Sequence, residues 1–429
     1  MRSTKRIVTE LNHNERKLLC LFKQYPNQNY FEANYANNGY PVQFDNGYFF
    51  NVRLDATIVK YLAGKKSTPT NPYYKYALLE EKPIGTGAFG TIYGSCKTFD
   101  MISDSSYSIK DKCPEKQRAF KYFKDVNAVF TLFIRKDAAG KIIEIKQKKM
   151  IDHAFDMLCR MGPYFRPKRS GDWLIMHKFP GINMNELFVK KKVKLNFYVT
   201  LVLFRKILCE LKIFHERGKI VHRDIKLDNI LVNGVLNTIL MECAISPDAS
   251  ESVLTFDVSD EVKQAAADIS VKIVDTDLGK AIEMDTSGTG VGSPIYASPE
   301  VFKQENVDEL TDVFSAWKLL RIMIKGYFDV SRYYLVNKAS DMKGVMPSME
   351  TVLPVAINKD KSDIYHEVYE LMCRMNLPAK NRITLNQCID KMSDIIQHCE
   401  AKFAQTSVAA SSEDLAAAAA MPSSSLSLR

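Results

Sequence analysis

The sequence lacks the features that mark membrane, secreted and metal-binding proteins. No run of about 18 uninterrupted apolar residues occurs, so no membrane span is expected, and no apolar core of a secretory signal follows the basic N-terminus. Nine cysteines are scattered without a CxxC pair or a Cys/His cluster at metal spacing. We therefore expect reduced, buried thiols and a cytoplasmic, reducing compartment.

A dense basic stripe is also missing. The formal net charge is +9, but Lys and Arg are spread over the whole chain, and the one tight run, Lys190 to Lys192, is typical of a solvated helix start. No nucleic-acid partner is therefore expected. The chain does have the composition of a folded protein, with 46% hydrophobic and 25% charged residues in 429 positions. That length suits one two-lobed domain with extensions, or two ordinary domains.

The pattern of residues changes along the chain. Residues 1–74 are polar and rich in Asn and Tyr, which predicts an N-terminal extension partly ordered against the body. From 75 to about 190 apolar and polar residues alternate between turn signals, as in a sheet, and from about 195 to 400 helical periodicity dominates. Residues 401–429 are rich in Ser and Ala, and we expect a disordered tail there.

A glycine-rich turn lies between two predicted strands. Residues 84–92 read IGTGAFGTI, with Gly85, Gly87 and Gly90 in G-x-G-x-x-G spacing. Glycines let backbone N–H groups approach phosphates without a Cβ in the way. The flanks YALLEEKPIG and TIYGSCK read as strands, whereas a dinucleotide-binding turn would open a helix. The pattern therefore favours a phosphate loop within a β-hairpin.

A phosphate loop of this kind needs a lysine on the next strand. The stretch RAFKYF alternates as a strand does and carries Lys121, while YSIK offers Lys110 as a competitor. The flanks of Lys121 have the better strand period. Choosing Lys121 requires a long insertion, about residues 99–116, between the second and third strands.

The strongest signal in the chain is the segment IVHRDIKLDNILV at 220–232. It resembles the catalytic loop of eukaryotic-type protein kinases, with the eight residues HRDIKLDN in fixed register. The resemblance implies that Asp224 accepts or orients the proton of the attacking hydroxyl, that Lys226 neutralises the moving phosphoryl group, and that Asn229 binds metal. A lysine at position 226 points to Ser/Thr rather than Tyr substrates.

The resemblance extends from about residue 78 to 398 and implies an α+β fold with two lobes. The kinase domain would occupy 75–400, with an antiparallel-sheet small lobe at 75–178 and a mainly helical large lobe at 179–400. The expected substrates are ATP and a protein that offers Ser or Thr. The expected cofactor is Mg²⁺, for which Mn²⁺ can substitute.

Further nucleotide contacts follow from the same resemblance. The stretch WLIMHKFPGINMNEL resembles the last small-lobe strand running into the hinge, with Met176 as the gatekeeper at the back of the adenine pocket. His177 to Phe179 would then be the hinge, whose backbone hydrogen-bonds adenine. In the phosphate loop, Thr86 and Ile92 would contact ATP together with the three glycines.

The family lysine, here Lys121, acts on the ATP phosphates and normally pairs with a helix glutamate. Glu144 is the only Glu between Lys121 and Glu186, so it is the default. The stretch VFTLFIRKDAAGKIIEIKQKK can equally be a strand, an Ala-Gly turn and a strand. The helix would then be KKMIDHAFDMLCRMG, and Asp152 or Asp156 would face the lysine.

The second metal ligand is expected in the stretch VKIVDTDLGKA. Asp275 takes the place of the Asp in the family's D-F-G, because the strand VKIV ends directly at it, and Thr276 then replaces the usual Phe. The alternative register uses Asp277. A long insertion, about 234–268, separates Asn229 from this strand.

Control by phosphorylation is implied by two features. Arg223, just before the catalytic aspartate, is able to bind a phosphate bidentately. A plausible activation loop precedes GSPIYASPE, and Thr289 stands where the family's regulatory phosphosite usually lies, with Thr286 and Ser287 as alternatives.

Two structural roles in the large lobe are also implied. GSPIYASPE resembles the family's G-T-P-x-Y-x-A-P-E, so Glu300 would pair with a buried arginine, for which Arg382 is suitable. Asp312, in the helix that follows, would cap the backbone of the catalytic loop from below.

The insertions, the divergent lobes, the N-terminal extension and the Ser-rich tail resemble effector kinases of intracellular bacteria, and some large-virus kinases look similar. This resemblance implies action inside a host cell. The alternative to an active kinase is a pseudokinase, a nucleotide-binding scaffold without transfer, which the variant D-T-D keeps open.

Overall fold

The protein is described by a computed structural model. It describes residues 40–43, 49–52, 58–62, 74–79, 82–87, 89–101, 107–110, 118–125, 127–136, 141–170, 172–193, 195–234, 258–283, 292–303, 307–325 and 362–419. The chain divides into two compact units. The first comprises Met1–Leu132 and Ile145–Phe179, and the second comprises Phe133–Glu144 and Pro180–Arg429.

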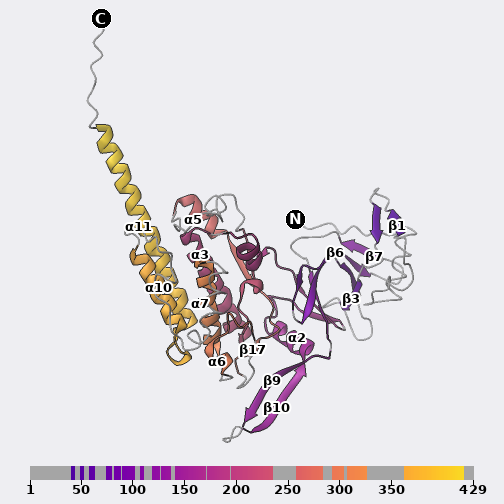
Figure 1. Ribbon diagram of the computed structural model, residues 1–429. Coiled ribbons are helices and arrows are strands. Elements are labelled where there is room, and N and C mark those ends of the chain that lie inside the picture. Colours follow the sequence, from indigo (N-terminus) through magenta and orange to yellow (C-terminus); the bar gives the residue numbers. More distant parts are fainter. Residues whose placement is uncertain are drawn as a thin grey trace. The chain divides into compact units, whose positions relative to one another are not determined.

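An antiparallel sheet forms the first unit, with the strand order β11-β12-β8-β6-β4-β3 and with β5 and β7 also paired to β6 (Figure 1). Its strands are β3 (Ile58–Leu62), β4 (Tyr74–Leu79), β5 (Gly85–Thr86), β6 (Gly90–Met101), β7 (Tyr107–Lys110), β8 (Arg118–Phe123), β11 (Lys168–Ser170) and β12 (Trp173–His177). Because β3 pairs with β4, the sheet begins before residue 75, inside the expected N-terminal extension. A separate pair, β1 (Tyr40–Gln43) and β2 (Phe49–Val52), also lies in that region.

Successive buried side chains on β8 and β12 build the core of this sheet. In β8 the side chain of Phe120 is fully buried and packs with Leu79, Trp173 and Ile175 from β4 and β12. The ring of Tyr93 on β6 lies 6.1 Å from that of Trp173. The stretch RAFKYF, predicted to be a strand, thus forms β8 between β12 and β6 in the sheet.

The stretch that contains Glu144 is a hairpin, made of β9 (Val129–Lys136) and β10 (Ile142–Lys149), and helix α2 (Met150–Arg160) follows β10 directly (Figure 1). The Nε2 group of Gln147 donates to Thr131 Oγ1 at 3.3 Å across the two strands. The second interpretation of this stretch is therefore correct, and the default placement of Glu144 on a helix is wrong. Apolar and polar residues alternate at the start of IEIKQKK, which favours a strand. The partner strand β9, however, cannot be identified from local propensity.

Helices dominate the second unit, as the periodicity predicted. They are α3 (Phe197–Ile213), α5 (Asp260–Ala267), α6 (Pro299–Phe302), α7 (Glu309–Lys325), α10 (Ser362–Asn376) and α11 (Leu385–Ala419) (Figure 1). Helix α3 begins where Asn196 Oδ1 accepts a hydrogen bond from Tyr198 N at 2.8 Å. It is buried on nearly all sides, as expected of its apolar sequence. Together with the sheet of the first unit, these helices confirm the predicted α+β class.

Two small sheets position the loops of the second unit. The strands are β13 (Ile182–Asn183), β14 (Ile220–Val221), β15 (Ile230–Asn233), β16 (Ser270–Ile273) and β17 (Lys280–Ala281). Strand β15 pairs with both β13 and β16, and β14 pairs with β17. Residues 222–229, which read HRDIKLDN, therefore lie between β14 and β15, and each of these strands is paired with other strands. Helix α5 lies within the insertion expected between β15 and β16.

The expected disordered tail differs from the structure. Helix α11 continues without a break from Leu385 to Ala419, well past the predicted boundary at residue 401. The first part of α11 is anchored, for example by Lys402 Nζ, which donates to Asp363 Oδ1 on α10 at 2.6 Å. Extending an anchored helix needs no new nucleus, and Ala is the best helix former, so the Ala-rich stretch stays helical.

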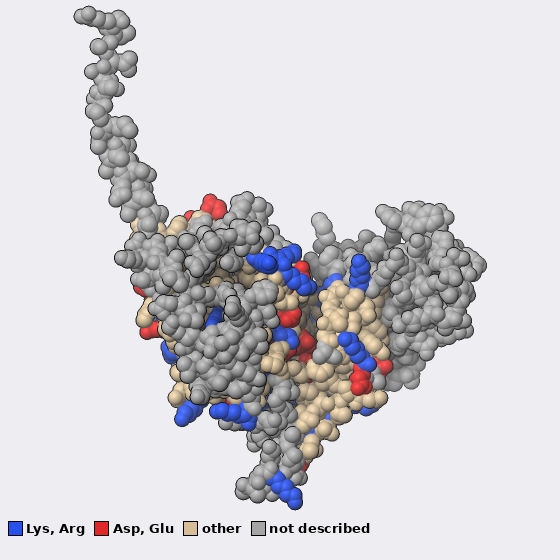
Figure 2. Space-filling view, viewed as in Figure 1, with Lys and Arg blue, Asp and Glu red and all other residues tan. Residues whose placement is uncertain are grey.

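The surface and the cysteines agree with the composition. Figure 2 shows Lys and Arg of the described residues in small groups among other side chains, not in one dense stripe. The cysteines that the structure describes in detail are free thiols, and two of them, Cys388 and Cys399, are buried. Among the described helices none combines the length and the apolar character needed to cross a bilayer.

Candidate active site

The catalytic segment is fixed from beneath by one buried carboxylate. Asp312 on α7 accepts hydrogen bonds from the backbone N–H of His222 at 2.7 Å and of Arg223 at 2.8 Å. The ring Nε2 of His215 lies 2.9 Å from Asp312 Oδ2. Asp312 is completely buried, so these donors replace water around its charge. The predicted role of Asp312 as a cap of the loop backbone is confirmed.

The groups around Asp312 favour the charged form of its carboxyl group. Burial by itself raises the pKa of this carboxyl group, but the hydrogen bond from His215 and the backbone of His222 outweigh it and hold the pKa below its usual value. Asp312 therefore remains an acceptor at neutral pH. The loop that carries Asp224 is thus held by a carboxylate that is negatively charged at neutral pH.

The carboxylate of Asp224 is surrounded by donors. Its Oδ2 lies 2.7 Å from Lys226 Nζ and accepts from Asn229 Nδ2 at 3.0 Å. Its Oδ1 accepts from both the backbone N–H and the Oγ of Ser293, at 3.1 and 2.9 Å. The prediction that Asp224, Lys226 and Asn229 lie together agrees with these contacts, but the sequence analysis did not identify Ser293. The available signal was its place as the second residue of GSPIYASPE.

A glycine allows Ser293 to reach the loop. Gly292 has φ +112°, and a Cβ at this position would lie 2.5 Å from the carbonyl oxygen of Arg223. A side chain is therefore excluded both by conformation and by space. The close backbone approach places Ser293 against Asp224. Lys226 Nζ also donates to Ser293 Oγ at 3.1 Å, which closes a triangle of three polar side chains.

Of the expected metal ligands, Asn229 lies directly before β15 and Asp275 shortly after β16. Val274 N donates to the carbonyl oxygen of Asn229 at 2.9 Å, which sets the residue before Asp275 beside Asn229. The Nδ2 of Asn229 is held by Asp224, so its Oδ1 is left as the oxygen donor. An amide oxygen and a carboxylate are hard ligands that suit Mg²⁺. Asp275, which is half-buried with φ +66°, fits this set.

The competing aspartate lies one turn further. Asp277 is buried at 3% exposure, inside a tight turn in which Gly279 N donates to Thr276 O at 2.9 Å. The position directly after the Val274 contact belongs to Asp275, which favours the predicted register. No group of three or more His, Cys, Asp or Glu side chains with metal-binding geometry occurs among the described residues. A metal at this site would therefore need the side-chain amide of Asn229 and the nucleotide substrate as ligands in addition to an aspartate.

Arg223 has a different environment from the one expected. Its Nε donates to Leu278 O at 2.7 Å and its guanidinium also reaches Gly279 O at 3.4 Å. Burial lowers the pKa of Arg223 to about 10, while the charge of Asp312 acts in the opposite direction. Arg223 thus ties the catalytic loop to the segment after Asp275. The candidate phosphosite Thr289 lies outside the described residues.

A buried ion pair connects two distant parts of the second unit. Arg382 Nη1 donates to Glu300 Oε1 at 2.6 Å and Arg382 Nη2 to Glu300 Oε2 at 3.2 Å, which is a bidentate ion pair. Burial raises the pKa of Glu300, but Arg382 overcomes this effect and the pKa is lowered overall. Arg382 also donates to Leu377 O and Leu310 O. The predicted Glu300–Arg382 pair is confirmed.

In the first unit, the glycine-rich segment forms a tight hairpin. Gly85 pairs with Ile92 and Thr86 with Thr91, and Gly87 N donates to Gly90 O at 2.9 Å. A Cβ on Gly90 would lie 2.3 Å from Tyr122 O, so this glycine is required by the packing of β6 on β8. The hairpin predicted between two strands is confirmed, and its exposed turn presents backbone groups.

Lys121 lies on the strand next to this hairpin. It pairs with Ile92 on β6 and with Leu174 on β12, and its side chain is buried at 5% exposure. The competitor Lys110 lies on β7 and pairs with Thr98, at the far end of β6 from the glycines. The register therefore favours Lys121 as the phosphate lysine.

Glu144, the default acid for Lys121, lies exposed on β10 and not on a helix. Helix α2 carries the two alternatives. Asp152 forms an ion pair with Arg169 on β11, and Asp156 forms one with Lys148 on β10. Both acids thus already have a basic partner. Of the two, Asp152 is the less exposed.

The expected hinge segment ends the first unit. Met176 on β12 pairs with Ala119, and His177 N donates to Phe165 O at 2.7 Å. The ring of Phe179 lies 5.0 Å from that of His177 and 5.7 Å from that of Phe165. Burial lowers the pKa of His177, and so does the positive charge of Arg118. A backbone segment supported by aromatic rings suits the recognition of a flat base.

The loop with HRDIKLDN, the glycine hairpin and the buried lysine are together typical of the protein kinase class. The model of the protein kinase domain matches residues 78–393. The chain therefore belongs to the protein kinase domain family.

Curated relatives with this domain come from several eukaryotes. The DNA damage response protein kinase DUN1 of Saccharomyces cerevisiae is 32% identical over 158 residues, which are 36% of this chain and 27% of the relative. Serine/threonine-protein kinase dkf-1 of Caenorhabditis elegans is 20% identical over 323 residues, 73% of this chain and 36% of the relative. Serine/threonine-protein kinase pakG of Dictyostelium discoideum is 24% identical over 239 residues, 54% of this chain and 15% of the relative. The matched regions thus span about a third or less of each relative's length.

Proposed function

We propose that this protein is an active serine/threonine protein kinase that transfers the γ-phosphoryl group of ATP to protein hydroxyls. The observation that carries the proposal is the arrangement around Asp224. A serine hydroxyl, that of Ser293, already lies 2.9 Å from the Asp224 carboxylate and 3.1 Å from Lys226 Nζ. The two side chains are therefore spaced to bind a hydroxyl between a base and a cation, as an acceptor serine or threonine requires.

The chain's own groups account for the transfer. The hydroxyl oxygen of the substrate forms a bond to the γ-phosphorus while its proton moves to a carboxylate oxygen of Asp224. The bond between the γ-phosphorus and the bridging oxygen breaks, and ADP leaves with the electron pair. Lys226 offsets the negative charge of the moving group. For this to occur, the substrate hydroxyl has to replace one of the donors that now surround Asp224.

Other residues of the chain are assigned to the nucleotide and the metal. Gly85, Thr86, Gly87, Gly90 and Ile92 provide the phosphate turn, Lys121 its cation, and Met176, His177 and Phe179 the adenine contacts. Asn229 and Asp275 would hold Mg²⁺, or Mn²⁺ in its place. When bound, the metal supplies positive charge to the phosphates.

The test compares the protein with Asp224→Asn and with a matched control, Asp228→Asn. Asp228 is exposed in the same loop, so its change leaves the network around Asp224 intact. With labelled Mg-ATP and a generic basic protein, we expect transfer to Ser or Thr by the wild type and by Asp228→Asn, and none by Asp224→Asn. Equal labelling by Asp224→Asn would contradict the assignment. Metal-dependent ATP binding without any transfer would favour a pseudokinase.

We further propose that the kinase acts in the cytoplasm of a host cell, as effector kinases do. The features behind this proposal are helix α5, inserted between β15 and β16, and the strands β1 to β3, which precede the matched residues 78–393. Fusion to a reporter that is active only in host cytoplasm tests it. A reporter signal that never leaves the producing cell would contradict the effector role and leave the kinase proposal untouched.

A further inference from the structure

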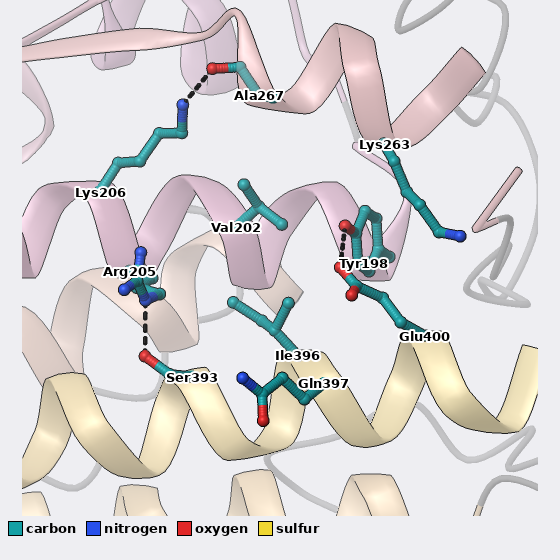
Figure 3. A pocket seen from close by; sticks show the side chains of 10 residues that line it. All are labelled: Tyr198, Val202, Arg205, Lys206, Lys263, Ala267, Ser393, Ile396, Gln397 and Glu400. Atoms are coloured by element: carbon teal, nitrogen blue, oxygen red, sulfur yellow. Dashed lines mark hydrogen bonds between the residues drawn. The ribbon is translucent and has the colours of Figure 1, made fainter. Parts of the chain in front are cut away.

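The second unit contains a groove outside the candidate active site. Three helices line it: α3 forms the floor, and α5 and α11 form the two walls (Figure 3). Its volume is about 360 Å³, within the roughly 300 to 1,000 Å³ of small-molecule sites. Helix α5 belongs to the insertion between β15 and β16, so the chain's own inserted segment creates one wall.

The middle of the groove is apolar. Val202 on the floor helix α3 and Ile396 on the wall helix α11 both line it (Figure 3). Val202 is half-buried, and no residue of the described chain completes its burial. An apolar surface in a concave site gains free energy when a ligand removes it from water.

One end of the groove is cationic. Arg205 Nε donates to Ser393 Oγ at 2.6 Å, and among the described residues no carboxylate lies within ion-pair distance of its guanidinium. Lys206 follows directly, and its Nζ donates to the carbonyl oxygens of Ala267 and Ile269, both at 2.6 Å. Two positive charges thus lie at this end, Arg205 turned toward α11 and Lys206 toward α5, and their hydrogen-bond partners are neutral (Figure 3).

The charge of Lys206 is costly in this position. Burial lowers the pKa of Lys206; the charge of Asp268 acts in the opposite direction, and the neighbouring Arg205 adds a smaller lowering effect. A negative group bound between Arg205 and Lys206 would offset both unfavourable effects.

The other end of the groove does not favour a second anion. Glu400 accepts a hydrogen bond from Tyr198 OH at 2.7 Å there, and Lys263 is already paired with Asp260 at 3.0 Å. The carboxylate of Glu400 would repel a negative charge (Figure 3). The groove is therefore polarised, with a cationic end, an apolar middle and an end that selects against anions.

We propose that this groove binds a small organic oxyanion, a phosphate monoester or a carboxylate, carried on a short apolar arm. The oxyanion lies between Arg205 and Lys206, and the arm covers Val202 and Ile396. Phosphate and carboxylate share the chemistry that Arg recognises through paired N–H groups.

Calorimetric titration of the full chain with phenyl phosphate and with benzoate tests the proposal. We expect at least one probe to bind, and phenol and inorganic phosphate, which each lack half of the recognised features, to bind about tenfold more weakly or worse. Preference for phenyl phosphate over benzoate, or the reverse, identifies the oxyanion. Binding should be unchanged by a non-hydrolysable ATP analogue. Displacement by that analogue would place the probe in the nucleotide site and overturn the proposal.

Variants separate this groove from other surfaces. Arg205→Gln should weaken binding about tenfold or more, because it removes a charged donor pair. Gln397→Glu places a negative charge in the groove at an exposed position that the fold does not need, and it should weaken binding about threefold to tenfold. Lys212→Gln, on the same helix α3 but paired with Glu216 outside the groove, should have no effect. Unchanged binding in both Arg205→Gln and Gln397→Glu, or no binding of either probe at about 10 mM, would refute the site.

Discussion

In the catalytic loop, the backbone N–H groups of His222 and Arg223 converge on one buried carboxylate, whereas the glycine turn is held mainly by its own backbone hydrogen bonds. The loop depends on Asp312, which lies about ninety positions away in the sequence. The hydrogen bonds within the turn join residues less than ten positions apart, while Gly90 also packs against Tyr122 on β8. The contrast shows two ways to fix a reactive segment: long-range buried charge in the second unit, and local strand geometry in the first.

The largest effect is expected from breaking the long-range framework at Arg382. Arg382→Met should lower the free energy of unfolding by about 3–5 kcal/mol, because it leaves Glu300 buried without its partner. Urea unfolding followed by circular dichroism measures it. The double variant Glu300→Met with Arg382→Met should recover part of the loss. A single variant as stable as the wild type would contradict the role.

The same pair gives a pH dependence with a definite sign. Because Arg382 holds the pKa of Glu300 below its unfolded value, which is about 4.3, the pair's contribution is present above that pH and is lost as the pH falls further. The stability difference between wild type and Arg382→Met should therefore shrink on acidification below about pH 4. A difference that grows in this range would exclude the explanation.

The next effect concerns the first unit. Lys121→Met should lower transfer activity by about a hundredfold or more, since it removes the cation assigned to the phosphates. Lys110→Met is the matched control, because Lys110 lies on β7 at the far end of β6 and should leave activity unchanged. Steady-state kinetics with a peptide substrate measures both. The reverse pattern would move the role to Lys110.

A smaller loss is expected from Asp312→Asn. One side of the new amide is a donor and would face the backbone N–H of His222 or Arg223, so one hydrogen bond is replaced by repulsion. A cost of about 1–3 kcal/mol corresponds to roughly tenfold to hundredfold in activity if the loop is displaced. Glu309→Gln, in the first turn of the same helix, is the control. Activity equal to that of the control would show that the loop does not need this charge.

The glycine turn offers a matched pair of its own. Gly90→Ala should destabilise the protein by about 1–3 kcal/mol, because the new Cβ would overlap Tyr122 O. Gly87→Ala meets only Gly90 O at 4.0 Å and should be tolerated in folding. Thermal unfolding compares the two. Equal melting temperatures would indicate that β6 and β8 separate easily.

The smallest effect is expected at Glu144. This residue lies exposed on β10, so Glu144→Gln should change activity by less than about twofold, within the usual range for surface positions. Asp152→Asn and Asp156→Asn test the two acids of α2 by the same assay. A severe loss in Glu144→Gln alone would restore the original assignment.

Segments with a strict local pattern could be read from the sequence. The glycine hairpin, the strand of Lys121 and the helix of Asp312 each combine a period with a fixed motif, and the structure places them as expected. The strand around Glu144 could not be assigned, because its pairing with β9 is not visible in local propensity. Ser293 was missed because its contact with Asp224 joins segments 69 positions apart.

Helix α11 has a consequence for anything attached beyond it. From Lys402, its contact with Asp363 on α10, the helix continues to Ala419. At a rise of about 1.5 Å per residue, these 17 residues extend about 25 Å. The helix thus acts as a semi-rigid spacer arm. A fluorescent label placed just after Ala419 would report on this arm, and energy transfer to a second label on α10 would measure how stiff the arm is.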